Sequence, residues 1–86
     1  MAGHILVVDD EEGVRFSLRG ILEDENYTVS EADSGENALL FLENNLVDLV
    51  FLDIWLTGID ELETIKRAKE LYPHIPFILI SGHGIV

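Results

Sequence analysis

Three carboxylates stand directly after two short apolar runs of the chain. Residues 4–8 (His-Ile-Leu-Val-Val) are followed by Asp9 and Asp10, and residues 48–52 (Asp-Leu-Val-Phe-Leu) are followed by Asp53. Short apolar runs rich in branched side chains are typical of strands buried on both faces of a parallel sheet. Because open α/β folds bind ligands at the carboxyl ends of their strands, the pattern predicts that the three acids meet at one edge of a sheet.

Carboxylates gathered at one place repel one another and raise one another's pKa values unless a cation or a proton relieves the site. Mg²⁺ is the simplest relief, since it takes oxygen ligands and is commonly shared between a few carboxylates and phosphate oxygens. Helix caps and strand-end loops also use Asp and Ser, so each residue taken alone has a structural alternative. The set of three acids, with Ser81 after a third apolar run at 77–80, indicates metal-assisted phosphate chemistry.

Composition limits the classes of protein. Eighty-six residues with 48% hydrophobic side chains predict one small globular domain. The net charge of −12, from 17 acids and 5 bases, argues against direct nucleic-acid binding by this segment. The absence of cysteine excludes disulfides and thiolate metal sites and is compatible with a reducing compartment. No apolar stretch is long enough for a membrane span or a signal peptide, so we expect a cytoplasmic protein without membrane contact.

Strand and helix patterns alternate along the whole chain, which predicts right-handed βαβ units and a doubly wound parallel sheet of the α/β class. The inward positions of the three helices are expected to be Val14, Leu18, Ile21 and Leu22, then Ala38, Leu39 and Leu42, then Leu62, Ile65, Ala68 and Tyr72. Arg15 and Arg19 fall largely outside the first of these stripes. Asp33 and Glu36 have the spacing of a capping box at the start of the second helix.

These motifs resemble the receiver domain of bacterial two-component response regulators. Residues 5–11 are similar to the family's first strand and acidic pair, 49–56 to its phosphoacceptor strand, and 80–83 to its switch-residue strand. The sequence at 81–84 is most like the nitrogen-regulation regulators of the NtrX/NtrC type. The resemblance implies a flavodoxin-like sheet with four strands in the order 2-1-3-4 and three helices. It also implies that residues 1–86 form a receiver domain that lacks the family's C-terminal part.

The resemblance assigns roles residue by residue. Asp53 would accept a phosphoryl group from a histidine kinase. Asp10 would bind Mg²⁺ directly and Asp9 mainly through water, with Asp53 and the backbone carbonyl of Trp55 as further ligands. Ser81 stands where the family has a hydroxyl that turns toward the phosphoryl group. The family's C-terminal lysine, which would pair with that group, has no counterpart by motif in these residues.

The function implied is a phosphoacceptor signalling module, with no enzymatic activity beyond Mg²⁺-dependent self-phosphorylation and dephosphorylation. Its partners would be a sensor histidine kinase and an output domain with ATPase and DNA-binding parts. One alternative is a receiver fragment that only self-associates, because the strand at 77–80 would be an exposed edge. The other is a Mg²⁺-dependent aspartyl-phosphate phosphohydrolase of the haloacid-dehalogenase type. Enzymes of that class have a second acidic residue two positions after the nucleophilic aspartate, where this chain has Trp55.

Overall fold

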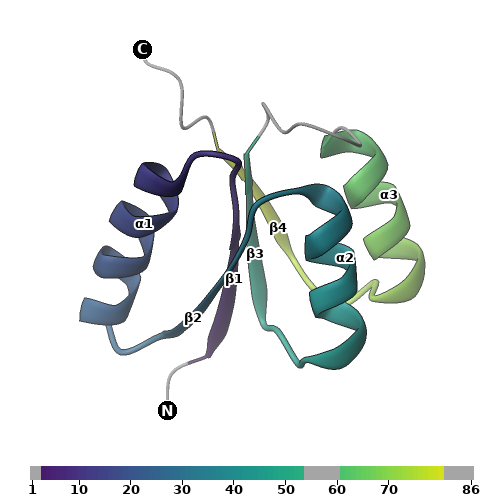
Figure 1. The fold of residues 1–86 in the computed structure, drawn as a ribbon. Helices are drawn as coiled ribbons and strands as arrows, with labels where there is room; N and C mark the ends of the chain where they lie inside the picture. The colour runs from purple at the N-terminus through teal and green to yellow at the C-terminus, as the bar shows by residue number, and fades with distance from the viewer. Residues whose placement is uncertain (1–2, 54–60, 81–86) are drawn as a thin grey trace.

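A computed structural model of the chain describes residues 3–53 and 61–80, in which strands and helices alternate as predicted (Figure 1). In chain order the elements are β1 (His4–Val8), α1 (Glu12–Asp24), β2 (Thr28–Ala32), α2 (Gly35–Asn44), β3 (Leu49–Asp53), α3 (Glu61–Leu71) and β4 (Phe77–Ile80).

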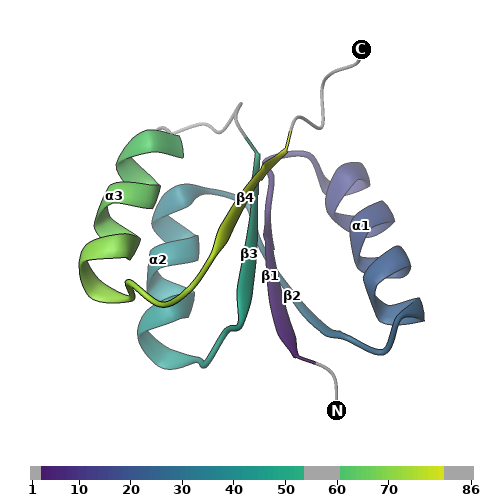
Figure 2. The ribbon, with the colours of Figure 1, turned by 180° about the vertical axis from the view of Figure 1, so that it is seen from behind.

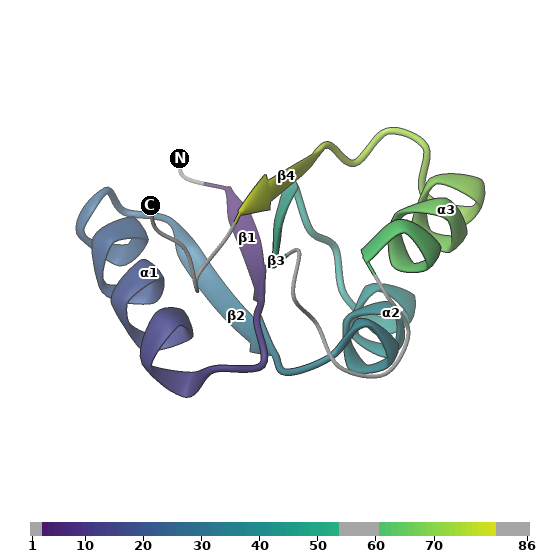
Figure 3. The ribbon, with the colours of Figure 1, turned by 90° about the horizontal axis from the view of Figure 1, so that it is seen from above.

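All strand pairs in the sheet are parallel, and the strand order is β2-β1-β3-β4. The predicted order is therefore confirmed. Helix α1 covers one face of the sheet, and α2 and α3 cover the other, as the two opposite views and the view from above agree (Figures 2 and 3). Strand β2 thus lies on one side of β1 in the sheet, and β3 and β4 lie on the other side. A sheet that is built outward from β1 in both directions has the doubly wound arrangement.

Alternate residues of β1 belong to two different cores. Leu6 and Val8 are buried in the cluster that includes residues of α2 and α3, whereas Ile5 and Val7 are buried in the cluster against which Leu18 of α1 packs. Side chains of a strand point to opposite faces in turn, so a central strand covered by helices on both faces needs an unbroken apolar run. This explains why the first five-residue strand carries almost no polar side chain before the acidic pair.

Two of the predicted inward positions are wrong. Ile21 is 62% exposed and Leu62 is 69% exposed. In α1, Leu18 and Leu22 lie on one row of the helix and pack on the sheet, whereas Ile21 is rotated by about 100° from Leu22 and lies on the flank. Leu62 lies in the first turn of α3, before Ile65, where the packing of this helix against the core begins.

The predicted capping box at α2 is also wrong by one residue. Ser34, not Asp33, is the N-cap, and its hydroxyl accepts a hydrogen bond from the backbone N–H of Asn37 at 3.1 Å. Asp33 instead accepts one from the side-chain amide of Asn37 at 2.7 Å. Ser and Asp are both good caps, so only the point at which the backbone turns helical decided between them.

Candidate functional site

The three predicted acids meet at one end of the two central strands. Asp9 and Asp10 follow the last residue of β1, and Asp53 is the last residue of β3. Because β1 and β3 pair in parallel with Val8 opposite Leu52, their carboxyl ends lie side by side. One carboxylate oxygen from each of the three residues lies within 4.8 Å of the others. The sheet therefore forms the cluster that the strand ends predicted.

The cluster lies at the topological switch point of the fold. Helix α1, which follows β1 in the chain, and helix α3, which follows β3, lie on opposite faces of the sheet. Ligands of open α/β folds bind at the strand ends where such helices diverge. Asp9 and Asp53 are fully buried, and Asp10 is partly buried. Buried carboxylates are costly unless a cation or hydrogen-bond donors compensate them.

The two carboxylate oxygens of Asp9 differ in their hydrogen bonding. Its Oδ1 accepts a hydrogen bond from the backbone N–H of Glu11 at 2.8 Å. Its Oδ2 is buried and has no hydrogen-bond donor among residues 3–53 and 61–80. An oxygen of this kind, within reach of two further carboxylates, fits the oxygen donor set that a hard divalent cation takes.

The pKa of Asp9 is raised above its ordinary value of 3.8. Burial is the largest cause, and the neighbouring charges of Asp53 and Asp10 add to it, while the hydrogen bond from Glu11 acts in the opposite direction. In the metal-free protein, Asp9 therefore holds a proton more readily than a solvated aspartate does.

This shift predicts a pH dependence of stability. Asp9→Asn should change the free energy of unfolding of the metal-free protein by an amount that depends on pH. The folded protein binds the Asp9 proton more tightly than the unfolded chain does, so the contribution of Asp9 is fully present below pH 3.8 and is lost as the pH rises through its raised pKa. Urea unfolding of both proteins in the presence of a chelator measures the difference. If the free energies of unfolding of the two proteins differed by the same amount from below pH 3.8 to above the folded-state pKa of Asp9, the raised pKa would be contradicted.

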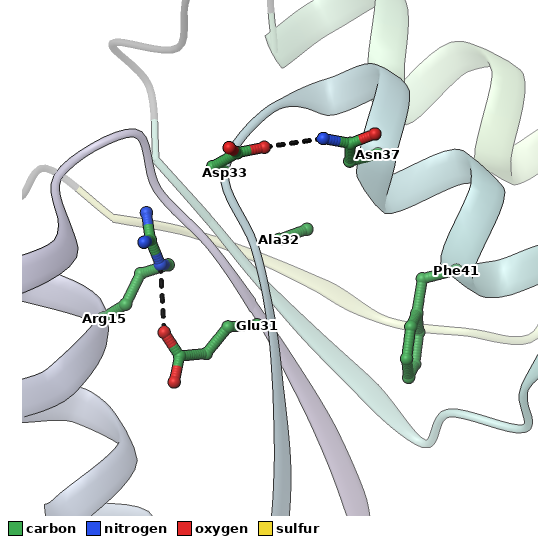
Figure 4. Close-up of a pocket in the computed structure, with 6 residues that line it drawn as sticks. All are labelled: Arg15, Glu31, Ala32, Asp33, Asn37 and Phe41. Atoms are coloured by element: carbon green, nitrogen blue, oxygen red, sulfur yellow. Dashed lines mark hydrogen bonds and ion pairs between the residues drawn. The ribbon is translucent and has the colours of Figure 1, made fainter.

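Arg15 is a residue of this region that the sequence did not indicate. Its side chain is only 15% exposed, and its guanidinium Nη1 donates a hydrogen bond to the backbone carbonyl of Asp9 at 2.6 Å. Its Nε donates to Glu31 of β2 at 3.0 Å (Figure 4). Helical periodicity assigned Arg15 to the outside of α1. The available signal was its place in the first turn after the acidic pair.

The predictions for Trp55 and Ser81 fall outside the residues that the structure describes. The role of the Trp55 carbonyl as a metal ligand and that of the Ser81 hydroxyl as a phosphoryl contact therefore stay predictions. Among the described residues, each helix is too short or too polar to cross a membrane.

The fold and the acidic cluster together define an α/β protein of the flavodoxin-like order with three clustered carboxylates at the β1/β3 switch point. Residues 5–85 match the family model of the response regulator receiver domain. The chain therefore belongs to the family of response regulator receiver domains, as its motifs predicted.

Individual relatives agree with this assignment. The nitrogen assimilation regulatory protein NtrX of Azorhizobium caulinodans is 43% identical over 86 residues, which are 98% of this chain and 19% of that protein. The crystal structure of NtrX from Brucella abortus in complex with ADP is 43% identical, with a TM-score of 0.89 over 98% of this chain and 20% of that one. The chain thus spans about a fifth of the length of these relatives.

A third relative is covered over most of its length. The response regulator protein TrrA of Thermotoga maritima, crystallised in complex with Mg²⁺ and BeF, is 36% identical to this chain. The TM-score is 0.89, and the match covers 98% of this chain and 72% of that one.

Proposed function

We propose that this chain is the phosphoacceptor module of a two-component system and that Asp53 receives a phosphoryl group from a histidine kinase in a Mg²⁺-dependent reaction. The observation that carries the proposal is the convergence of Asp9, Asp10 and Asp53 at the β1/β3 switch point. Receiver-domain membership and the Mg²⁺ complex of the related TrrA support it.

Each acid has a distinct task in this proposal. Asp53, at the end of β3, attacks the phosphorus atom of the donor in line with the leaving group. As the family resemblance implies, Asp10 would bind the metal directly and Asp9 would act mainly through a water molecule, with the Oδ1 of Asp9 held by the Glu11 N–H. When bound, Mg²⁺ supplies counter-charge to the oxygens of the transferred group. The Trp55 carbonyl completes the ligands, and the Ser81 hydroxyl donates to the new phosphoryl oxygens.

The partners and location follow from the same assignment. The proposed phosphoryl donor is a sensor histidine kinase. We expect an output domain with ATPase and DNA-binding functions in a longer protein, since the chain covers only 19% of the nitrogen assimilation regulatory protein NtrX. The net charge of −12 disfavours contact between this segment and DNA. A cytoplasmic location fits these partners.

Acetyl phosphate tests the proposal without knowledge of the kinase. Incubation with acetyl phosphate and Mg²⁺ should add the mass of one phosphoryl group, detected by intact mass spectrometry, and a chelator should prevent it. Turnover of a phosphomonoester, with phosphate released continuously, would instead support the phosphohydrolase alternative. Failure of both reactions would contradict the proposed function.

We further propose that the 86-residue chain self-associates through β4. This strand lies at one edge of the sheet, with Ile78 43% and Leu79 49% exposed. An exposed apolar edge is a template for pairing with a second copy. Ile78→Lys should weaken self-association about tenfold or more in sedimentation velocity, since a buried charge at such a contact costs more than about 1.4 kcal/mol.

Leu46→Lys is the matched control, because Leu46 is 92% exposed and belongs to the segment between α2 and β3 and not to the edge strand β4. Both variants make the acidic chain less negative, which by itself favours association. Weaker association in Ile78→Lys alone would therefore run against the electrostatic trend. A monomer at high micromolar concentration, or equal association of both variants, would refute pairing through β4.

A further inference from the structure

Asp9 is held by three hydrogen bonds that leave only one of its oxygens to the acidic cluster. Its backbone N–H donates to the carbonyl of Ala32 in β2 at 3.1 Å. Its Oδ1 accepts from the Glu11 N–H at 2.8 Å, and its backbone carbonyl accepts from Arg15 Nη1 at 2.6 Å. The carboxylate is thereby oriented so that Oδ2 is the atom available to a cation.

The carbonyl that Arg15 contacts belongs to the peptide group between Asp9 and Asp10. A peptide group is planar, so a hydrogen bond to its oxygen restrains the torsion angles on both sides, ψ of Asp9 and φ of Asp10. These torsions decide in which direction both side chains leave the backbone. One hydrogen bond from Arg15 therefore acts on two of the three acids in the cluster.

Arg15 is itself held in place by β2. Its Nε donates to Oε1 of Glu31 at 3.0 Å, and the two residues, in direct contact, line one pocket together with Asn37 and Phe41 of α2 (Figure 4). Glu31 also accepts from Arg19 Nη1 at 2.8 Å through its other oxygen. A planar guanidinium can satisfy a carboxylate and a carbonyl at once in a fixed geometry, which a flexible ammonium does less well.

We propose that Arg15 is a positioning residue for the metal site: through the Asp9 carbonyl, and braced by Glu31, it holds Asp9 and Asp10 in the arrangement that binds Mg²⁺. The inference rests on the proposed function, because it concerns the same acidic cluster. Mutual repulsion pushes the acids apart when the cation is absent, so a support on the backbone maintains their spacing. Loss of such a supporting hydrogen bond commonly lowers metal affinity about 10- to 100-fold.

Arg15→Gln and Arg19→Gln provide the test. Both remove one positive charge bonded to Glu31, but only Arg15 reaches the Asp9 carbonyl. Loss of a nearby positive charge alone should strengthen Mg²⁺ binding in both variants. We expect calorimetric titration to show about a tenfold weaker affinity for Arg15→Gln and an affinity for Arg19→Gln within about twofold of the unsubstituted protein.

A second measurement reports on the metal-free protein. The carbonyl ¹³C chemical shift of Asp9, which responds to hydrogen bonding at that oxygen, should change in Arg15→Gln and stay unchanged in Arg19→Gln. If Arg15→Gln does not fold, Arg15→Lys and Arg19→Lys carry the same comparison, with the charge retained. Equal Mg²⁺ affinities within a pair would overturn the role of Arg15. Absence of Mg²⁺ binding in the unsubstituted protein would contradict the proposed function instead.

Discussion

Replacing Asp53 with asparagine is expected to abolish phosphorylation by acetyl phosphate. Asp53 is the last residue of β3, is fully buried and lies in the cluster with Asp9 and Asp10. An amide oxygen is a far weaker nucleophile than a carboxylate, and the covalent aspartyl phosphate cannot form on asparagine. Intact mass spectrometry after incubation with acetyl phosphate and Mg²⁺ should show the added phosphoryl group in the unsubstituted protein and none in Asp53→Asn.

Asp33→Asn is the matched control for this variant. Asp33 follows β2 at the same carboxyl end of the strands, but it is exposed. It accepts a hydrogen bond from the side-chain amide of Asn37, and the amide oxygen of an asparagine at position 33 could accept the same bond. Phosphorylation of Asp33→Asn should equal that of the unsubstituted protein. Phosphate that persists in Asp53→Asn would show that another residue is the acceptor and would refute the assignment of Asp53.

The second large effect concerns Mg²⁺ affinity. Asp10→Asn is expected to weaken Mg²⁺ binding about 30-fold, because the loss of a charge in direct contact with the cation at a partly buried site costs about 2 kcal/mol. Asp9→Asn should weaken it by less, because Asp9 is expected to act through water and keeps its bond to the Glu11 N–H. Isothermal titration calorimetry at constant pH and ionic strength measures both affinities, with Asp33→Asn again as the control.

A second effect of opposite sign makes this prediction specific. Asp9→Asn and Asp10→Asn each remove one negative charge from a cluster of three carboxylates. The metal-free protein should therefore become more stable to urea in each variant, while its Mg²⁺ affinity falls. A substitution that merely damaged the fold would lower both quantities. Unchanged Mg²⁺ affinity in both variants would exclude the cluster as the metal site.

The alternation of strand and helix and the burial of β1 on both faces could be predicted from the sequence. An unbroken apolar run such as Leu6-Val7-Val8 has few stable environments other than a doubly covered parallel strand, so local composition determines this part of the fold. The strand order came from the family resemblance. The exposure of Ile21 could not be predicted, because it depends on how far the apolar surface of the sheet extends beneath α1.

The same division applies to the site. The sequence by itself determined which acids follow the central strands, and parallel pairing of β1 with β3 requires that such residues meet at one edge. Only the tertiary structure decided that Arg15 of α1 turns inward to the Asp9 carbonyl and that Glu31 of β2 holds it there. Periodicity reports the average face of a helix, whereas a hydrogen bond between α1, the β1 end and β2 depends on distances that arise when the elements pack together.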